Sequence, residues 1–364
     1  MKNLMPSLFF KNKKLNIMMH NRMYCFKFWV GIMIVAIFIF GLNSNQSYTQ
    51  SCTIITSVYD GSVLFGNNED WHSKDLLIGF YPATKDRFAS VQVGFHHRNG
   101  SIEFGGAMND QGLAWDVNSL PRIKLSPHPE RTFSHETDNY LSTITGAAAT
   151  VEEAIKIANN FNFGDSMSLQ IHIADATGDA VVISAGRNGE VVFTRKTTGD
   201  GYLVSTNFNL ANPDNGTKGW RYDTATSMLD KLISSGEISI ESIGNILEAV
   251  HLNNLTTYTM YSNIFDLKNR KIYLYYLSQY DELVELDLTE EILKGKRIVE
   301  MRDLFRADTV EAGQAAYRRF DMRFTAAKIA VILSIILLMT GIIVFGMRKV
   351  RTKRQTHTAN NEDN

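Results

Sequence analysis

Residues 51–71 read SCTIITSVYDGSVLFGNNEDW, and this stretch decides how the rest of the chain is interpreted. Two short apolar runs, 54–59 and 62–65, flank Asp60 and Gly61, a residue pair typical of a two-residue β-hairpin turn. Because a hairpin folds back on itself, Asp70 is expected to return close to Cys52. The pattern therefore predicts a thiol and a carboxylate at one end of a hairpin.

Cys52 is a candidate nucleophile that would use its own α-amine as the base. A thiol is a weak nucleophile until a base removes its proton. A free α-amine has an unperturbed pKa of about 7.7–8.0, so it can act as that base near neutral pH. Cleavage before Cys52 would free this amine, and Asp70 would hold and orient it.

The same stretch resembles the start of the linear-amide branch of the N-terminal nucleophile hydrolases, the choloylglycine hydrolases and penicillin V acylases. Mature chains of that family begin with Cys-Thr, run through a hairpin and reach Gly-Arg-Asn-x-Asp. This chain has Cys52 and Thr53, followed by GNNED at 66–70. The aspartate matches Asp70, whereas Asn67 stands at the position of the arginine. The resemblance implies an amidase with a cysteine nucleophile, and the change at Asn67 bears on its substrate preference.

Two asparagines fall at positions where the resembling family places active-site amides. Asn118 follows the block MNDQGL at 108–113 and a short expected strand that ends at Asn118 itself. Asn207 follows an expected strand over 202–205. The resemblance implies that both amides help to stabilise an oxyanion, and losing one such donor costs about 10²–10³-fold in rate. For Asn118, the residues alone equally allow an asparagine that simply ends a strand.

Arg221 is the last candidate site residue. It lies in GWRYD at 219–223, just before an expected helix over 224–233. The family carries an arginine followed by an aromatic residue near this point, and the resemblance gives that arginine an active-site role. The alternative is an ion pair between Arg221 and Asp223 at the start of the helix.

Many short apolar runs separated by turns predict a protein rich in β-strands; examples are 76–81, 88–95 and 102–104. The resemblance extends over roughly 52–287 and implies an α+β fold, a four-layer αββα sandwich of two antiparallel sheets. The order of the layers comes from the resemblance and not from the periodicity.

Residues 1–51 are interpreted as a signal peptide or propeptide. Residues 1–27 carry basic but no acidic side chains, and 28–42 are continuously apolar or glycine. As a helix this run is roughly 22 Å long, shorter than a bilayer core of about 30 Å. A basic flank, a short apolar run and a polar exit are typical of a signal peptide, and the small residues Thr49 and Ser51 suit cleavage before Cys52.

The C-terminal part predicts a membrane anchor. Residues 329–347 contain no charge, and five basic residues follow within 348–354. The domain limits are therefore 52–322 for the catalytic domain, 326–347 for a transmembrane helix and 348–364 for a basic tail. The positive-inside rule places the tail in the cytoplasm and the catalytic domain outside it.

The composition narrows the classes of ligand and partner that the protein is expected to bind. The net charge of −1 gives no indication of nucleic-acid binding, and Cys25 lies in the leader, so no disulfide is expected in the mature domain. His96 and His97 are adjacent on an expected strand and would face opposite sides, which makes a poor metal site. No metal and no cofactor are predicted. The expected partners are a small-molecule amide and the membrane, and a homo-oligomer is allowed.

Other interpretations remain open at this point. Cys52 could carry a lipid or be a simple buried thiol, although 49–51 make a poor lipobox. The same fold could serve an acyltransferase, or a membrane-tethered ligand-binding protein that has lost catalysis. No substrate-binding residue is assigned, because the loops that line the pocket decide among bile salts, acyl-homoserine lactones, N-acyl lipids and β-lactams.

Overall fold

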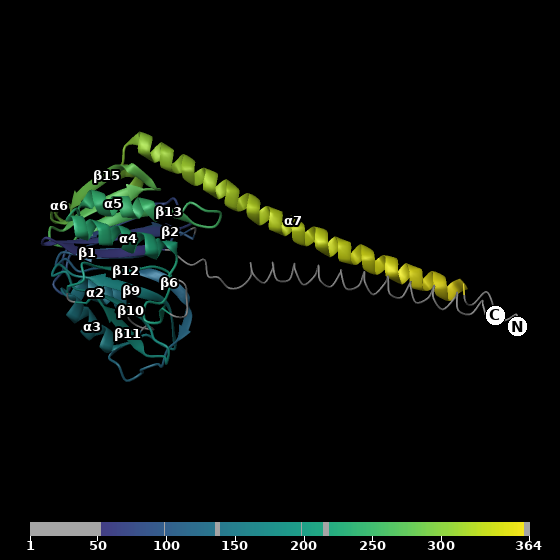
Figure 1. Ribbon diagram of the computed structural model, residues 1–364, viewed down its shortest axis with the longest axis horizontal. Helices are drawn as coiled ribbons and strands as arrows, with labels where there is room; N and C mark the ends of the chain where they lie inside the picture. Colours follow the sequence, from purple (N-terminus) through teal and green to yellow (C-terminus); the bar gives the residue numbers. More distant parts are fainter. Residues whose placement is uncertain (1–51, 98, 135–138, 198, 214–217, 360–364) are drawn as a thin grey trace. The chain divides into compact units, whose positions relative to one another are not determined.

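The computed structural model describes residues 52–97, 99–134, 139–197, 199–213 and 218–359 of the chain (Figure 1). The expected leader, 1–51, lies outside these residues. The chain divides into two compact units, of which residues 48–326 form one and residues 327–364 belong to the other.

The first sheet contains the predicted hairpin. Its strand order is β12 (Tyr202–Ser205), β1 (Thr53–Tyr59), β2 (Ser62–Trp71), β13 (Tyr258–Asp266), β14 (Lys271–Tyr276) and β15 (Gln279–Asp287). β1 and β2 pair antiparallel from Thr53 opposite Asn68 to Tyr59 opposite Ser62. Asp60 and Gly61 both have positive φ angles, of 43° and 79°, as a two-residue hairpin turn requires. The hairpin prediction is therefore confirmed.

The second sheet has eight strands. In order they are β11 (Val191–Arg195), β10 (Ala180–Ala185), β9 (Ser166–Ala174), β6 (Ala114–Lys124), β5 (Ile102–Asn109), β4 (Ser90–His96), β3 (Leu76–Tyr81) and β16 (Arg297–Glu300). A two-stranded parallel pair, β7 (Phe133–Ser134) with β8 (Phe161–Asn162), lies apart from both sheets.

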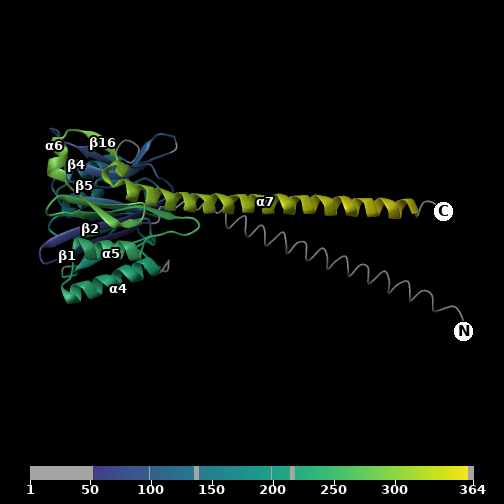
Figure 2. The ribbon, with the colours of Figure 1, turned by 90° about the horizontal axis from the view of Figure 1, so that it is seen from above.

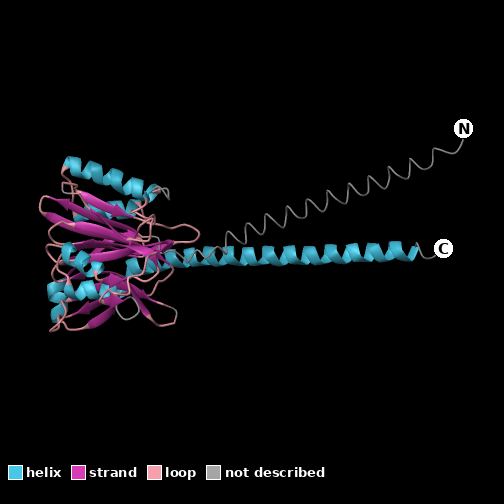
Figure 3. Cartoon of the chain, turned by 90° about the horizontal axis from the view of Figure 1, so that it is seen from below, coloured by secondary structure: helices cyan, strands magenta, loops and turns pink. Residues whose placement is uncertain are grey.

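Helices cover the outer face of each sheet (Figure 3). Helices α4 (Trp220–Ser235) and α5 (Ile240–Ala249) bury apolar side chains against β1, β2 and β13, and lie side by side in Figure 2. Helices α2 (Tyr140–Ala147) and α3 (Val151–Asn159) do the same against β6, β9 and β10. A third apolar cluster fills the space between the two sheets. The predicted αββα sandwich is confirmed; α6 (Leu288–Leu293) and a 3-10 turn (Met301–Leu304) complete it.

One strand boundary expected from the sequence is wrong. Strand β6 does not end at Asn118 but continues to Lys124, paired with β9 as far as Ser166. The pairing shifts register between Ser119 and Ile123, and Pro121 lies within that shift. Proline has no N–H for a regular ladder, so an irregular segment of a strand can accommodate it.

The last helix, α7 (Ala307–Ala359), belongs to both units. Within the sandwich unit, Tyr317 and Phe320 pack against the ring of Tyr258. Further along, an 18-residue window has a mean hydropathy of 2.8 with no residue buried. By length and composition, α7 is a candidate membrane span.

Candidate active site

The β1–β2 hairpin brings Cys52 next to two carboxylates. Cys52 immediately precedes β1 and is fully buried, and the pairing of Thr53 with Asn68 places it beside Glu69 and Asp70. Side chains alternate between the two faces of a strand. Cys52 and Glu69 point into the space between the sheets, like Phe65, whereas Asp70 points to the side of α4 and α5, like Leu64.

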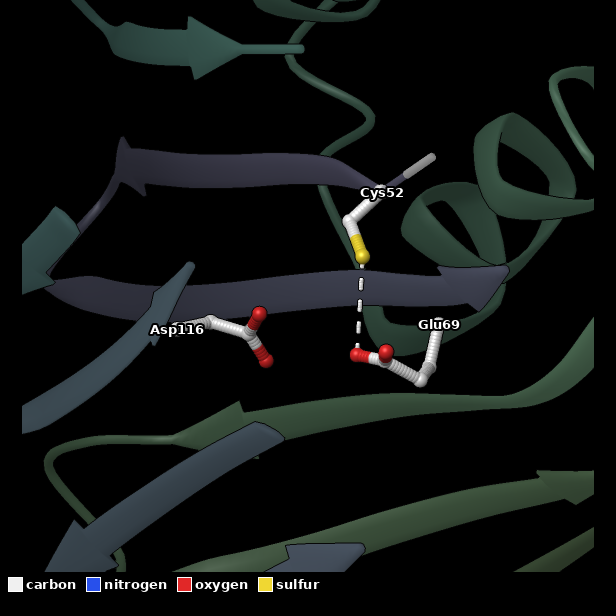
Figure 4. A group of neighbouring side chains, drawn as sticks. All are labelled: Cys52, Glu69 and Asp116. Carbon is white, nitrogen blue, oxygen red and sulfur yellow. Dashed lines mark hydrogen bonds between the residues drawn. The ribbon is translucent and has the colours of Figure 1, made fainter. Parts of the chain in front are cut away.

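The Cys52 thiol lies against an acidic pair. Its Sγ donates to Glu69 Oε2 at 3.5 Å, and Asp116 of β6 reaches the same place from the second sheet (Figure 4). The sulfur and one oxygen of each carboxylate all lie within 4.8 Å of one another. Burial raises the pKa of the thiol, and the charges of Glu69, Asp116 and Asp70 raise it further. A backbone hydrogen bond from Asp70 acts in the opposite direction.

Asp70 has a different environment. Arg221 Nη1 lies 3.4 Å from its Oδ2, and the Thr259 hydroxyl donates to its Oδ1. Burial raises the pKa of Asp70 to about 7, while Arg221 and Thr259 limit that rise. This carboxyl can therefore change its charge near neutral pH.

Arg221 connects the remaining parts of the site. It lies in the first turn of α4 and is only 11% exposed. Besides Asp70, its guanidinium donates to Thr53 Oγ1 at 3.0 Å and to Asn207 Oδ1 at 2.8 Å. The arginine thus contacts the residue after Cys52 and ties it to Asn207.

The two asparagines reach the same end of the sandwich. Asn118 Nδ2 donates to the backbone carbonyl of Cys52 at 3.0 Å, and Asn207 Nδ2 donates to the carbonyl of Ser119 at 3.0 Å. Gln170 of β9 fixes this arrangement, since its Nε2 donates to Asn118 Oδ1 and to the carbonyl of Thr206. Hydrogen bonds therefore hold both amides in place, that of Asn118 on the backbone of Cys52 and that of Asn207 on the backbone of Ser119.

All five residues singled out from the sequence, Cys52, Asp70, Asn118, Asn207 and Arg221, are thus brought together by one chain of contacts. Sequence reasoning singled out Asn67 only as the residue at the position of the family's arginine. It missed a further set of buried polar residues around the site, namely Glu69, Asp116, Gln170, His172 and Thr259. The alternation of side chains along a strand could have indicated two of these residues. Glu69 lies in the GNNED segment beside Asp70, and Asp116 lies two residues before Asn118, on the same face of the strand.

His172 does not supply a second base. Its ring lies between the Thr56 hydroxyl and the Ser205 hydroxyl, at 2.9 Å from each. Burial lowers its pKa to about 3, so the imidazole stays neutral. The ring is best described as a buried polar bridge between β1, β9 and β12.

Comparison with known proteins identifies a matching family model and solved structures with the same fold. Residues 58–280 match the model of a family described as acyl-coenzyme A:6-aminopenicillanic acid acyl-transferase. Two variants of conjugated bile acid hydrolase from Clostridium perfringens, each 18% identical, align with TM-scores of 0.55 and 0.54 over 68% of this chain and 96% and 95% of theirs. Penicillin V acylase from Agrobacterium tumefaciens, 16% identical, aligns with a TM-score of 0.51 over 66% of this chain and 87% of its own. No curated protein matches the chain. At these identities, the solved structures show a shared fold.

Proposed function

Because the chain belongs to the acyl-coenzyme A:6-aminopenicillanic acid acyl-transferase family, within the N-terminal nucleophile hydrolases, we propose that it hydrolyses a linear, non-peptide C–N amide bond with Cys52 as nucleophile. The observation that carries this proposal is the convergence of four separate segments on Cys52. Strand β2, strand β6, the residues after β12 and helix α4 all place a polar side chain within one hydrogen-bonded group around it.

The proposed reaction begins with the mature N-terminus. Cleavage before Cys52 leaves an α-amine that takes the thiol proton as Sγ attacks the substrate carbonyl. The C–N bond then breaks, the amine returns the proton to the leaving nitrogen, and a thioester remains. Water attacks the thioester, its proton passes through the amine to Sγ, and the acid product leaves. Asp70 orients the amine as a positioning residue.

The amides of Asn118 and Asn207 are the proposed oxyanion donors. Each amide nitrogen has two hydrogens, so the bond of Asn118 to the Cys52 carbonyl uses only one of them. A donor held in place before the reaction stabilises the charge that develops on the carbonyl oxygen without reorganisation. Arg221 supports both halves of the site, since it contacts Asp70 and holds the oxygen of the Asn207 amide.

The proposal also covers the location. We infer a leader over 1–51, a catalytic domain over 52–322 outside the cytoplasm, a single span over 326–347 and a cytoplasmic tail over 348–364. Support comes from the exposed apolar window of α7 and from the basic residues that follow it. The protein would then act on small amides while tethered to a membrane.

The first experiment determines the N-terminus of membrane-extracted protein by intact mass and terminal sequencing. The expected chain begins at Cys52 with a free amine, and it turns over members of a panel of linear amides. Cys52→Ala should abolish that turnover while the thermal unfolding curve stays cooperative. A mature chain that retains residues before Cys52, or a Cys52→Ser variant with full turnover, would disprove the mechanism.

Acyl transfer is a second candidate, because the matching family model is itself described as an acyl-transferase. The same thioester would then pass its acyl group to an amine in place of water. Adding a primary amine to the active enzyme and measuring new amide product against free acid separates the two reactions. If the ratio of amide product to free acid does not rise with the amine concentration, the result favours hydrolysis alone.

A further inference from the structure

The charges with the largest effect on the acidic pair beside Cys52 are all negative. The charges with the largest effect on Glu69 are Asp70 and Glu103, and the one acting on Asp116 is Glu69 itself. Arg221 lies on the other face of β2, with Asp70. His172, which lies opposite Asp116 in the β6–β9 pairing, is held by two hydroxyls and is neutral. Two fully buried carboxyls and a thiol thus share one space between the sheets, and the largest charge effects on each of them come from other acidic groups.

The hydrogen-bonding capacity of this group is not used up. Among the residues that the structure describes, Glu69 Oε1 and Asp116 Oδ2 have no hydrogen-bond partner, although both side chains are fully buried. Asn67 is an independent sign. It is neutral and fully buried, it lies two residues before Glu69 on the same face of β2, and its amide oxygen also has no partner in the described chain. Unpaired buried polar atoms are rare in folded proteins, and a bound ion is one way in which such atoms are satisfied.

The donor atoms suit a divalent metal ion. A tetrahedral zinc ion with a sulfur ligand at about 2.3 Å and an oxygen ligand at about 2.0 Å holds those two atoms about 3.5 Å apart. The distance from Cys52 Sγ to Glu69 Oε2 is 3.5 Å. The Asp116 oxygen lies within 4.8 Å of both. One thiolate, two carboxylates and one amide oxygen form a mixed sulfur and oxygen set, which favours zinc over magnesium or calcium.

We propose that Cys52, Glu69 and Asp116, with Asn67 as a fourth ligand, form a binding site for a divalent metal ion of the zinc type. The ion would supply the positive charge that the side chains between the sheets lack. It would also engage the sulfur that the proposed reaction needs, so the metal-bound chain is inactive and removal of the metal restores the nucleophile. The binding itself does not depend on the proposed function, because a chain without amidase activity would still hold the ion.

The test uses full-length protein extracted in detergent and stripped with a chelator. Titration with Co²⁺ should give one equivalent bound per chain and the absorption of a thiolate-to-cobalt charge transfer. Zn²⁺ should displace the cobalt and raise the melting temperature. Glu69→Gln and Asp116→Asn should each weaken binding by about 100-fold, because loss of an outer-sphere partner alone costs about 10–100-fold. Cys52→Ser should remove the charge-transfer absorption.

A matched control addresses surface sites. The exposed pair of His97 and Glu103 could also attract zinc, so His97→Gln should change neither the cobalt spectrum nor the melting shift. The proposal is overturned if wild-type protein binds cobalt without thiolate absorption, or if Glu69→Gln binds as tightly as wild type. Glu69 and Asp116 lie on different sheets. If one of the two variants fails to fold, the other variant still tests the proposal.

Discussion

Glu69 and Asp70 are neighbours on β2, both fully buried, yet they have opposite surroundings. Asp70 faces the helices and meets Arg221 and a threonine hydroxyl. Glu69 faces the opposite sheet and meets a thiol, with Asp116 close by. Burial raises the pKa of both carboxyls. Arg221 acts against that rise at Asp70, whereas the charge of Asp70 adds to it at Glu69. Burial alone therefore does not decide what a buried carboxyl can do; the face of the strand does.

This difference assigns separate tasks to the two carboxyls. A carboxyl near a guanidinium can ionise close to neutral pH and hold a charged or hydrogen-bonding partner, as the proposed amine requires. A carboxyl with only negative neighbours stays protonated or takes up a cation. Substitutions on the two faces should consequently differ in kind as well as in size.

The largest expected effect is on catalysis. Asp70→Asn keeps the shape of the side chain but removes the charge that orients the proposed α-amine. We expect kcat/KM to fall by about 10²–10⁴-fold, as for other orienting carboxylates. In the wild type, kcat/KM should rise through about pH 7 as Asp70 ionises, and the variant should lose that limb of the profile. Steady-state kinetics across pH 5.5–9 measure both effects.

Asp266 provides the matched control for this prediction. It is also a buried aspartate of the first sheet, but it lies at the end of β13 that pairs with Leu64, away from Cys52. Asp266→Asn should keep the wild-type pH profile. If Asp70→Asn retains the limb near pH 7, another group produces it and the orienting role of Asp70 is wrong.

The next effect in size is on stability. Arg221→Ala leaves Asp70 buried without its cation, and breaking such a pair by removing one partner typically costs about 3–5 kcal/mol. Adding Asp70→Asn to this variant should recover much of the loss, because the buried charge then disappears. Urea unfolding of the wild type, both single variants and the double variant at pH 8 gives the coupling energy.

A surface arginine is the control here. Arg195 pairs with Asp179 and Glu152, but its side chain is 46% exposed. Arg195→Ala should cost at most about 1 kcal/mol, as for exposed ion pairs. If Arg195→Ala and Arg221→Ala lower the free energy of unfolding equally, the contact with Asp70 does not stabilise the fold more than an exposed ion pair does.

The sequence was sufficient for local features of this site. The turn at Asp60 and Gly61 fixes the hairpin register, and the register alone places Asp70 near Cys52. The resemblance to the choloylglycine hydrolases singled out Asn118 and Asn207, although the strand holding Asn118 runs further than expected because β9 continues to pair with it.

The contacts between elements were beyond sequence reasoning. Asp116 meets Glu69 only because two sheets stack face to face, and no local pattern encodes which strands lie opposite each other. The hydrogen bond of Arg221 to Asn207 likewise depends on how α4 docks on the first sheet. Alternation along β2 shows that Glu69 and Asp70 differ, but the structure is needed to say which of them meets the cation.

The smallest expected effect is the pH dependence that Glu69 gives to stability. Burial raises its pKa from the usual 4.5 to about 8 in the folded protein. The folded state then holds a proton that the unfolded state releases, so stability is greatest below about pH 4.5 and falls as the pH rises towards 8. Glu69→Gln should match the wild type at pH 4 and exceed its stability by at least about 2 kcal/mol at pH 8. Urea midpoints measured with chelator present test this.

The chelator matters because a bound metal reverses the sign. With saturating Zn²⁺ the wild type gains the binding free energy, which Glu69→Gln forfeits, so the variant becomes the less stable protein at pH 8. Glu152→Gln is the control, since that carboxylate is 71% exposed and is not among the charges with the largest effect on Glu69, so its replacement should leave the pH dependence unchanged. A Glu69→Gln variant that loses stability at pH 8 without metal would show that the inner carboxyl is ionised and paired in the folded protein. The contrast between the two faces of β2 would then be wrong.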